Sequence, residues 1–392
     1  MSVWPTIRPT PIQVVGQGFS GPLRFGILST YPPTLCGLAF FSAALAEGLK
    51  AHGADVSVVR VSDGLPSEST HVIGELVSGS RSSAATCVEL LNRKDVAVIQ
   101  YGHDIYGGVD GDEIVDILAG LRVPSIVVAH IVPEFPKRQR SVFERVVASA
   151  DQVVVMSEAA HRGLCSGFHV DRRKVVTIPH GSTLPPPEAS SSRCHRPSLV
   201  TWGLMGPGKG IERVIDAMRS LRDLPGRPRY LVAGRTHPKV LAAEGEAYRD
   251  ARVDQARRNG VEDSVVFDSG YRNGAMLTAL AQSAAAVVLP YDSTDRVTSG
   301  VLVDAIANGR PVVATAFPHA VELLAGGAGI VVAQDDPDAM VSALRRVLTQ
   351  PRLAGEMAAE ARRLAPEMAW PAVASAYLQL AGRLLAQRRA AV

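Results

Sequence analysis

The feature that most constrains the fold is an alternation of apolar strand-like runs with helical runs, which occurs twice in the 392 residues. A strand, a helix and a second strand in this order form a parallel unit, because parallel strands need a long crossover connection. We therefore predict an α/β protein with two doubly wound, Rossmann-like lobes, whose ligand lies at the carboxyl ends of the strands. Strands are expected at 23–30, 54–61, 95–103, 125–130, 151–157 and 174–181, then at 199–203, 229–234, 264–270, 285–291, 311–315 and 329–333.

A stretch rich in Pro and Ser separates the two series, and such stretches are typical of interdomain linkers. The predicted units are listed in chain order: a Pro-rich leader at 1–22, an N-terminal lobe at 23–183, the linker at 184–197, a C-terminal lobe at 198–365 and a C-terminal helix at 366–392.

The composition excludes several classes of protein. A net charge of +3 gives no support to a nucleic-acid partner, and the four cysteines lack zinc-ligand spacing and are expected to be reduced. The first residues lack a signal-peptide pattern, and no apolar run is long enough to span a bilayer. We expect a cytoplasmic protein.

A peripheral contact at the inner face of the membrane stays open as an alternative. The segment 136–150 predicts a helix with Lys137, Arg138, Arg140 and Arg145 beside an apolar face. Such a helix can lie on an anionic membrane, but the sequence favours a core helix with a solvated basic face.

The segment Thr298–Thr315 joins a small-residue turn, a short helix carrying Asp304, and a second strand. Free N–H groups at the helix start, around Ser299 and Gly300, can bind an anion. Asp304 can accept hydrogen bonds from the two hydroxyls of a ribose. The segment alone fits a nucleotide diphosphate site and a plain capped helix equally well.

Two glycine-rich motifs need their context. Gly16 to Gly21 matches the dinucleotide pattern but precedes a strand rather than a helix, so it is read as a turn. Gly203 to Gly210 resembles a P-loop with Lys209, yet Gly210 stands where a P-loop supplies the Mg²⁺-binding hydroxyl. The glycines and one Lys can still face a phosphate without a metal.

The two C-terminal motifs, 203–218 and 299–324, together resemble the retaining glycosyltransferases of family four, which have the two-lobed GT-B fold. Further segments resemble the family in the same order along nearly the whole chain: 29–37, 125–130, 151–160, 176–181 and 368–380. The last of them resembles the helix that crosses back to the N-terminal lobe.

The resemblance implies transfer of a sugar from a nucleotide sugar to a carbohydrate, lipid or small-molecule acceptor, with retention and without a metal or other cofactor. It places His130, Lys209 and Asp304 as catalytic residues. The implied donor site contains Gly37, Gly206, Lys209, Arg235, Asp295, Arg296, Thr298, Ser299, Gly300, Val301 and Asp304. The Gly-rich loop with His103, Asp104 and Tyr106 is assigned to the acceptor side.

This chain departs from the family pattern at two positions. Arg296 stands where the family has the first of two acids, with Asp295 one residue earlier, and Leu204 stands where it often has Arg. We expect Arg235 or Arg296 to replace the missing positive charge. Glu322 matches a family acid near the donor, although a Glu near a helix N-terminus explains it too, and His180 is expected to shape the hinge.

Two other functions remain open from the sequence. A GT-B protein that binds a nucleotide sugar without turnover fits the changes at Leu204 and Arg296. A nucleotide-sugar epimerase shares the fold, but its chemistry needs acids and histidines placed for proton abstraction, and no motif in the sequence supplies them.

Overall fold

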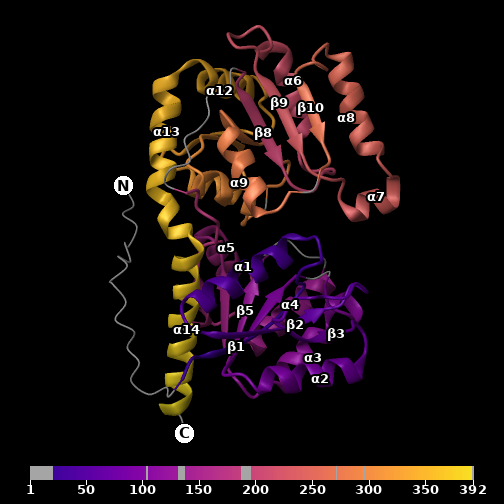
Figure 1. Ribbon diagram of the computed structural model, residues 1–392, viewed down its shortest axis with the longest axis vertical. Helices are drawn as coiled ribbons and strands as arrows, with labels where there is room; N and C mark the ends of the chain where they lie inside the picture. Colours follow the sequence, from indigo (N-terminus) through magenta and orange to yellow (C-terminus); the bar gives the residue numbers. More distant parts are fainter. Residues whose placement is uncertain are drawn as a thin grey trace.

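The computed structural model describes residues 21–102, 105–130, 137–186, 196–270, 272–294 and 296–390, which form two α/β lobes (Figure 1). The N-terminal lobe has a seven-stranded parallel sheet in the order β3-β2-β1-β4-β5-β6-β7. Its strands are β1 Arg24–Ser29, β2 Asp55–Val61, β3 Val72–Leu76, β4 Val96–Tyr101, β5 Ser125–Ala129, β6 Gln152–Val155 and β7 Val175–Thr177. Its helices are α1 Gly37–Ala51, α2 Arg81–Asn92, α3 Glu113–Gly120, α4 Lys137–Ser149 and α5 Glu158–Gly167.

The C-terminal lobe repeats this plan with six parallel strands in the order β10-β9-β8-β11-β12-β13. The strands are β8 Ser198–Trp202, β9 Arg229–Ala233, β10 Val265–Asp268, β11 Ala286–Leu289, β12 Val312–Thr315 and β13 Gly329–Val332. The helices are α6 Ile211–Leu221, α7 Pro238–Glu244, α8 Ala247–Arg258, α9 Gly274–Ser283, α10 Gly300–Ala307, α11 Pro318–Leu323, α12 Pro337–Thr349 and α13 Pro351–Leu364.

Both sheets are covered on two faces, so their strands are buried almost throughout. In each sheet the strand order reverses at one point, between β1 and β4 and between β8 and β11. Loops that leave neighbouring strands diverge there, which is where open α/β sheets bind ligands. The two reversal points therefore mark the carboxyl edge of each lobe as the place to look for a site.

The chain crosses between the lobes twice, at neighbouring positions. The segment after β7 runs beside the junction between η3 (Ala365–Met368) and α14 (Trp370–Ala390). Ser182 N–H donates to the Met368 carbonyl at 2.7 Å, and Trp370 N–H donates to the Ser182 carbonyl at 3.2 Å. α14 then packs on α1 of the N-terminal lobe (Figure 1), with Gly48 close against Ala374.

The predicted α/β class and the returning C-terminal helix are confirmed. Several elements were missed, namely β3, α2, α5, α7 and α8, and their composition explains this. α8 is rich in Arg and Asp and buries only Ala256, and β3 has only Leu76 fully buried, so neither carries a strong apolar period. The predicted leader and part of the linker fall on residues 1–20 and 187–195, outside the described residues.

Candidate donor and acceptor sites

The first turn of α10 forms an open helix start at the carboxyl edge of the C-terminal sheet. Ser299 is the N-cap, and its hydroxyl accepts a hydrogen bond from Leu302 N–H at 3.3 Å. The backbone N–H groups of Gly300 and Val301 come next and have no acceptor within the helix. An anion placed there meets two free donors and the positive end of the helix dipole.

Two cations lie against one aromatic ring beside this turn. The Lys209 Nζ and the Arg296 guanidinium carbon are each 4.7 Å from the centroid of the Tyr291 ring. Tyr291 is only 1% exposed and follows β11, so it is a fixed platform. Neither cation has an acidic partner among the residues that the structure describes, and the Arg296 Nε is buried without a hydrogen bond. The pair can neutralise a diphosphate.

The glycine turn before α6 has the backbone that brings Lys209 to this place. Gly203, Gly208 and Gly210 all have positive φ, at 115°, 85° and 63°. A Cβ at Gly210 would meet the Pro290 carbonyl oxygen, so only glycine fits there. The Lys209 Nζ comes within 3.7 Å of where a Gly203 Cβ would lie, which folds its side chain back over the turn.

Asp304 lies on α10 and faces the crossing segment of the other lobe. The Ser182 hydroxyl donates to Asp304 Oδ1 at 2.6 Å. Burial raises the pKa of Asp304 to about 6, and the bond from Ser182 acts in the opposite direction. The second carboxylate oxygen has no hydrogen bond within the described part of the chain, so it is available to a ligand hydroxyl.

His130 ends β5 and lies at the seam between the lobes. Its Nε2 is 2.6 Å from Gln100 Oε1, and its ring meets Phe41 edge-on at 4.8 Å. Since an amide oxygen only accepts, Nε2 carries the proton and Nδ1 is the ring's acceptor. Burial lowers the pKa of His130 to about 3, so the imidazole is neutral.

Two further histidines were not placed at the site by the sequence. The ring Nδ1 of His319 on α11 accepts the Ser299 N–H at 2.9 Å, and the backbone N–H of His319 donates to the Arg296 carbonyl at 3.3 Å. His180 lies close to Gly300, since a Cβ there would be 3.1 Å from the His180 Nε2. Both side chains support the 296–300 turn. A histidine in an otherwise apolar helix start, as in 317–323, was the available signal.

Glu322 lies on α11 but reaches the other lobe. Its carboxylate accepts the N–H groups of Glu158 and Ala159, at 2.9 and 2.6 Å, at the start of α5. Ser157, the N-cap of α5, donates its hydroxyl to the Val297 carbonyl at 2.6 Å. Glu322 lies near the end of α11, so the expected place near the start of its own helix is wrong, and the helix start that it binds is that of α5 in the N-terminal lobe. These contacts form an interlobe clasp made of Ser157, Glu322 and the start of α5.

The other predicted donor residues are placed as follows. Thr298 has a buried hydroxyl without a partner in the described chain, which makes it available to a ligand. The side chain of Val301 lies near Gly203, at the glycine turn. Arg235 is exposed after β9, Gly37 begins α1, and Gly206 accepts the Lys209 N–H at 3.2 Å. Asp295 lies outside the described residues.

The acceptor-side prediction is described only at Tyr106, because His103 and Asp104 lie outside the described residues. Tyr106 is 6% exposed, and its hydroxyl donates to the Gln100 carbonyl at 2.7 Å. Burial raises its pKa well above the usual value. Its position supports packing under the loop rather than contact with an acceptor.

The basic helix α4 has its apolar face in the core of the N-terminal lobe. Val142, Phe143 and Val146 are 5% exposed or less. Arg138 pairs with Asp110 at 3.3 Å, and Arg140 pairs with Glu144 at 3.2 Å. The interpretation as a core helix fits this burial. No helix among the described residues is long and apolar enough to cross a membrane.

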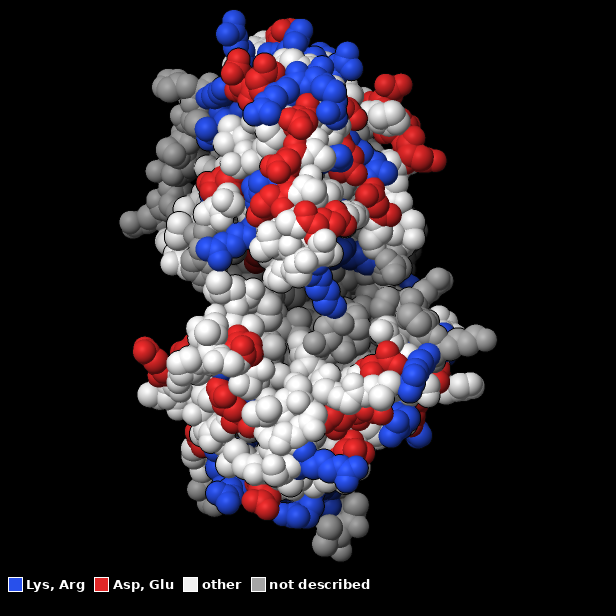
Figure 2. Space-filling model, turned by 90° about the vertical axis from the view of Figure 1, so that its right-hand side faces the viewer, with Lys and Arg blue, Asp and Glu red and all other residues white. Residues whose placement is uncertain are grey.

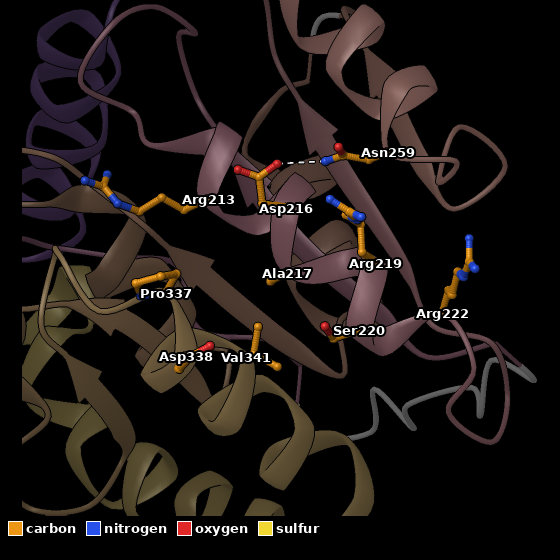
Figure 3. Close-up of a pocket in the computed structure, with 10 residues that line it drawn as sticks. All are labelled: Arg213, Asp216, Ala217, Arg219, Ser220, Arg222, Asn259, Pro337, Asp338 and Val341. Atoms are coloured by element: carbon orange, nitrogen blue, oxygen red, sulfur yellow. Dashed lines mark hydrogen bonds between the residues drawn. The ribbon is translucent and has the colours of Figure 1, made fainter.

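A surface pocket of about 570 Å³ lies elsewhere, on the outer side of α6 and α12 (Figure 3). Two of its charged residues have partners already: Asp216 accepts from Asn259 Nδ2 at 2.7 Å, and Arg213 is paired with Asp292. All its lining residues belong to the C-terminal lobe. It is not part of the site between the lobes.

The surface and the side-chain clusters give two more observations. Figure 2 shows Lys and Arg interspersed with Asp and Glu on both lobes, with a narrowing between them. On this face no extended basic patch marks a nucleic-acid partner. In the described ranges, no group of three or more His, Cys, Asp and Glu side chains is arranged to hold a metal ion.

Comparison with known proteins adds to this geometry. Residues 36–183 match the family described as Glycosyltransferase Family 4, and residues 196–350 match Glycosyl transferases group 1. A D-inositol 3-phosphate glycosyltransferase from Kineococcus radiotolerans is 29% identical over 63% of this chain and 60% of its own. A glycogen synthase from Mycobacterium tuberculosis is 28% identical over 60% of this chain and 55% of its own. The matches thus span little more than half of these relatives.

Solved structures agree on the fold. A sucrose-phosphate synthase from Thermosynechococcus elongatus superposes with a TM-score of 0.73 at 19% identity, covering 93% of this chain and 100% of its own. Anabaena HepE in complex with UDP and glucose gives 0.73 at 15% identity, covering 92% and 100%. At such identities the likeness establishes the architecture alone. With the two family matches, which together cover both lobes, it shows that the chain belongs to glycosyltransferase family four and has the GT-B fold.

Proposed function

We propose that the protein transfers a sugar from a nucleotide sugar to an acceptor hydroxyl, with retention of anomeric configuration and without a metal ion. The observation that carries this is the pair Lys209 and Arg296 on the Tyr291 ring, beside the open start of α10. Two cations without acidic partners and two free N–H groups fit a diphosphate, because both of its charges are then neutralised.

The nucleotide fits around this anion site. Asp304 has one carboxylate oxygen free for a ribose hydroxyl, and Thr298 has an unpartnered hydroxyl near the same turn. The support for a uridine nucleotide is that Anabaena HepE, with the same fold, binds UDP and UDP-glucose. The acceptor supplies only a hydroxyl, whether it is a carbohydrate, a lipid or a small molecule.

The reaction breaks the bond between the anomeric carbon and the diphosphate oxygen, and forms a bond from that carbon to the acceptor oxygen. The acceptor proton passes to the departing phosphate oxygen, so no protein base is needed. Negative charge builds up on the diphosphate as the bond breaks. Lys209, Arg296 and the N–H groups of α10 stabilise that charge, which lowers the barrier.

His130 has a positioning role in this scheme. Its pKa of about 3 keeps the ring neutral, and its Nε2 proton is held by Gln100. The Nδ1 atom accepts a hydrogen bond from a sugar hydroxyl in the cleft. This orients the sugar and does not require His130 to take up the acceptor proton.

The test is to incubate the protein with UDP-, GDP- or ADP-glucose without an acceptor and to monitor hydrolysis by nuclear magnetic resonance. We expect one of the three to be cleaved slowly, with the anomeric configuration retained in the first-formed sugar. EDTA should leave the rate unchanged. Cleavage that stops with EDTA and returns with Mg²⁺ or Mn²⁺ would refute metal independence.

Binding without turnover is the second candidate, and Arg296 favours it, because a cation stands where relatives have an acid. In that case a nucleotide sugar raises the melting temperature of the protein but is cleaved neither alone nor with acceptors. Lys209→Ala should abolish the thermal shift in either case.

A further inference from the structure

We infer that Ser182, which follows β7 of the N-terminal lobe, is a positioning residue for the donor: its hydroxyl holds the Asp304 carboxylate of the C-terminal lobe in place to receive the ribose. This rests on the proposed function, which assigns the ribose to Asp304. The contact is direct, with Ser182 Oγ donating to Asp304 Oδ1 at 2.6 Å.

Ser182 is itself fixed by the crossing between the lobes. Its N–H and carbonyl bond to Met368 and Trp370, at 2.7 and 3.2 Å, and it is 3% exposed. Next to it, a Cβ on Gly181 would overlap the ring of Trp370, so the backbone is packed tightly against α14. A hydroxyl on such a backbone has few positions open to it, and one of them reaches Asp304.

The bond leaves Asp304 with one fixed and one free oxygen. Oδ1 is taken by Ser182, and Oδ2 has no hydrogen bond within the described residues. A carboxylate anchored through one oxygen presents the other in a defined direction, which suits hydroxyls that must be bound in one orientation. Without Ser182 the group is free to rotate and, because it is buried, to take up a proton.

Protonation matters because a neutral carboxyl group accepts hydrogen bonds more weakly. Burial raises the pKa of Asp304 to about 6, and the Ser182 bond opposes that rise. Removing the hydroxyl therefore moves the pKa further up, toward neutral pH. Donor affinity should be high above this pKa and should fall as the pH drops through it.

Among the titratable side chains around α10 that are considered below, we assign the change in donor affinity near pH 6 to Asp304. His180 and His319, at the near end of α10, have pKa values lowered by burial to about 4 and about 3, so both are neutral near pH 6. Arg362 on α13 contacts Gly309, at the far end of α10, and Glu367 in η3 is exposed.

Two ion pairs on α13 complete the charged residues of that helix. Arg352 pairs with Glu356 at 3.0 Å, and Arg363 pairs with Glu360 at 2.7 Å. The helix α9 and the strand β12 carry no titratable residue.

The experiment measures the affinity for UDP-glucose by calorimetry between pH 5 and pH 8.5, or for GDP-glucose or ADP-glucose if the wild type binds that one instead, because the diphosphate of a nucleotide sugar has no terminal phosphate that titrates near pH 6. At pH 7 we expect Ser182→Ala to bind about tenfold more weakly, because a hydrogen bond to a charged group is lost. Its pH midpoint should lie above that of the wild type. Ser182→Thr, which keeps the hydroxyl, should restore the midpoint.

Ser125→Ala is the matched control. Ser125 is also buried and donates to a carboxylate, that of Asp151 at 3.0 Å, but it begins β5 and so lies at the amino edge of the N-terminal sheet. It should leave the affinity and the midpoint unchanged.

Asp304→Asn supplies the decisive comparison. Its affinity should no longer depend on pH near 6, and adding Ser182→Ala to it should cost little more. If Ser182→Ala weakens binding equally in both backgrounds, or leaves the wild-type midpoint in place, the inference is wrong. If the wild type binds none of the three nucleotide sugars, the proposed function itself fails.

Discussion

At the carboxyl edge of the C-terminal sheet, Lys209 and Arg296 have no acidic partner in the described chain. At the same edge of the N-terminal sheet, the buried charged side chains of Arg60 and Glu113 are hydrogen-bonded to other parts of their own lobe. Arg60, 0% exposed, binds the carbonyls of Tyr31 and Leu65 and the Glu75 carboxylate. The two lobes share one fold, but the charged side chains at the carboxyl edges of their sheets thus have different partners.

Glu113 is a second charged residue of the N-terminal lobe whose hydrogen bonds are all made within that lobe. Its two oxygens accept the N–H groups of Gly79 and Gly107, at 3.0 and 2.9 Å, and so tie the loops after β3 and β4 together. Arg60 and Glu113 thus hold loops of the N-terminal lobe together, whereas Lys209 and Arg296 of the C-terminal lobe are left for a ligand. The comparison teaches that the donor site is marked by charged side chains without an acidic partner in the described chain. A charged side chain near the end of a strand is not sufficient.

The largest effect expected from this contrast is on Lys209. Lys209→Ala should lower kcat/KM by about 10²–10³-fold, as loss of one charge-stabilising group does, while the melting temperature stays near that of the wild type. Lys239→Ala, on α7 of the same lobe, is the control for loss of a lysine. A loss of activity under tenfold for Lys209→Ala would remove it from the diphosphate site.

Arg60 should show the reverse pattern. Arg60→Met removes the donor from Glu75 Oε1, from the Asp63 carboxylate and from two carbonyls, and we expect a loss of about 2–3 kcal/mol in unfolding free energy. Denaturant unfolding measures it. Nucleotide affinity of the folded protein should stay unchanged, and a tenfold drop in that affinity would break the division between the lobes.

Arg296 tests which charge the donor site needs. Arg296→Ala should weaken nucleotide binding about tenfold, by the loss of one charge-assisted hydrogen bond, and Arg296→Lys should recover most of it. Calorimetry with the nucleoside diphosphate gives both values. Arg296→Glu places an acid where relatives have one. Should that variant bind or turn over better than the wild type, Arg296 does not serve the diphosphate.

Tyr106 should have the smallest effect. Tyr106→Phe removes the bond to the Gln100 carbonyl and should cost about 1 kcal/mol of stability, with kcat and the acceptor KM unchanged. Thermal unfolding and steady-state kinetics on the same sample are sufficient. A raised acceptor KM with unchanged stability would return Tyr106 to the acceptor site.

The α/β alternation could be predicted because buried strands such as β11 and β12 are continuous apolar runs. Polar helices such as α8 could not be predicted, because they bury few side chains and their sequences have little apolar periodicity. At the site, the glycine turn and the α10 start follow from local sequence. The anchoring of Ser299 by His319 and of α5 by Glu322 does not, because the partners are 20 and 164 residues apart.

The place of α14 has a consequence for the order in which the protein is made. Val373, Tyr377 and Leu380 of this helix share a core cluster with Phe41, Leu45 and other N-terminal residues. The N-terminal lobe leaves the ribosome first, but its core is complete only when α14 has been synthesised, after the whole of the C-terminal lobe. Until then the apolar face of α1 that packs on α14 stays exposed to water, which favours aggregation of the nascent N-terminal lobe.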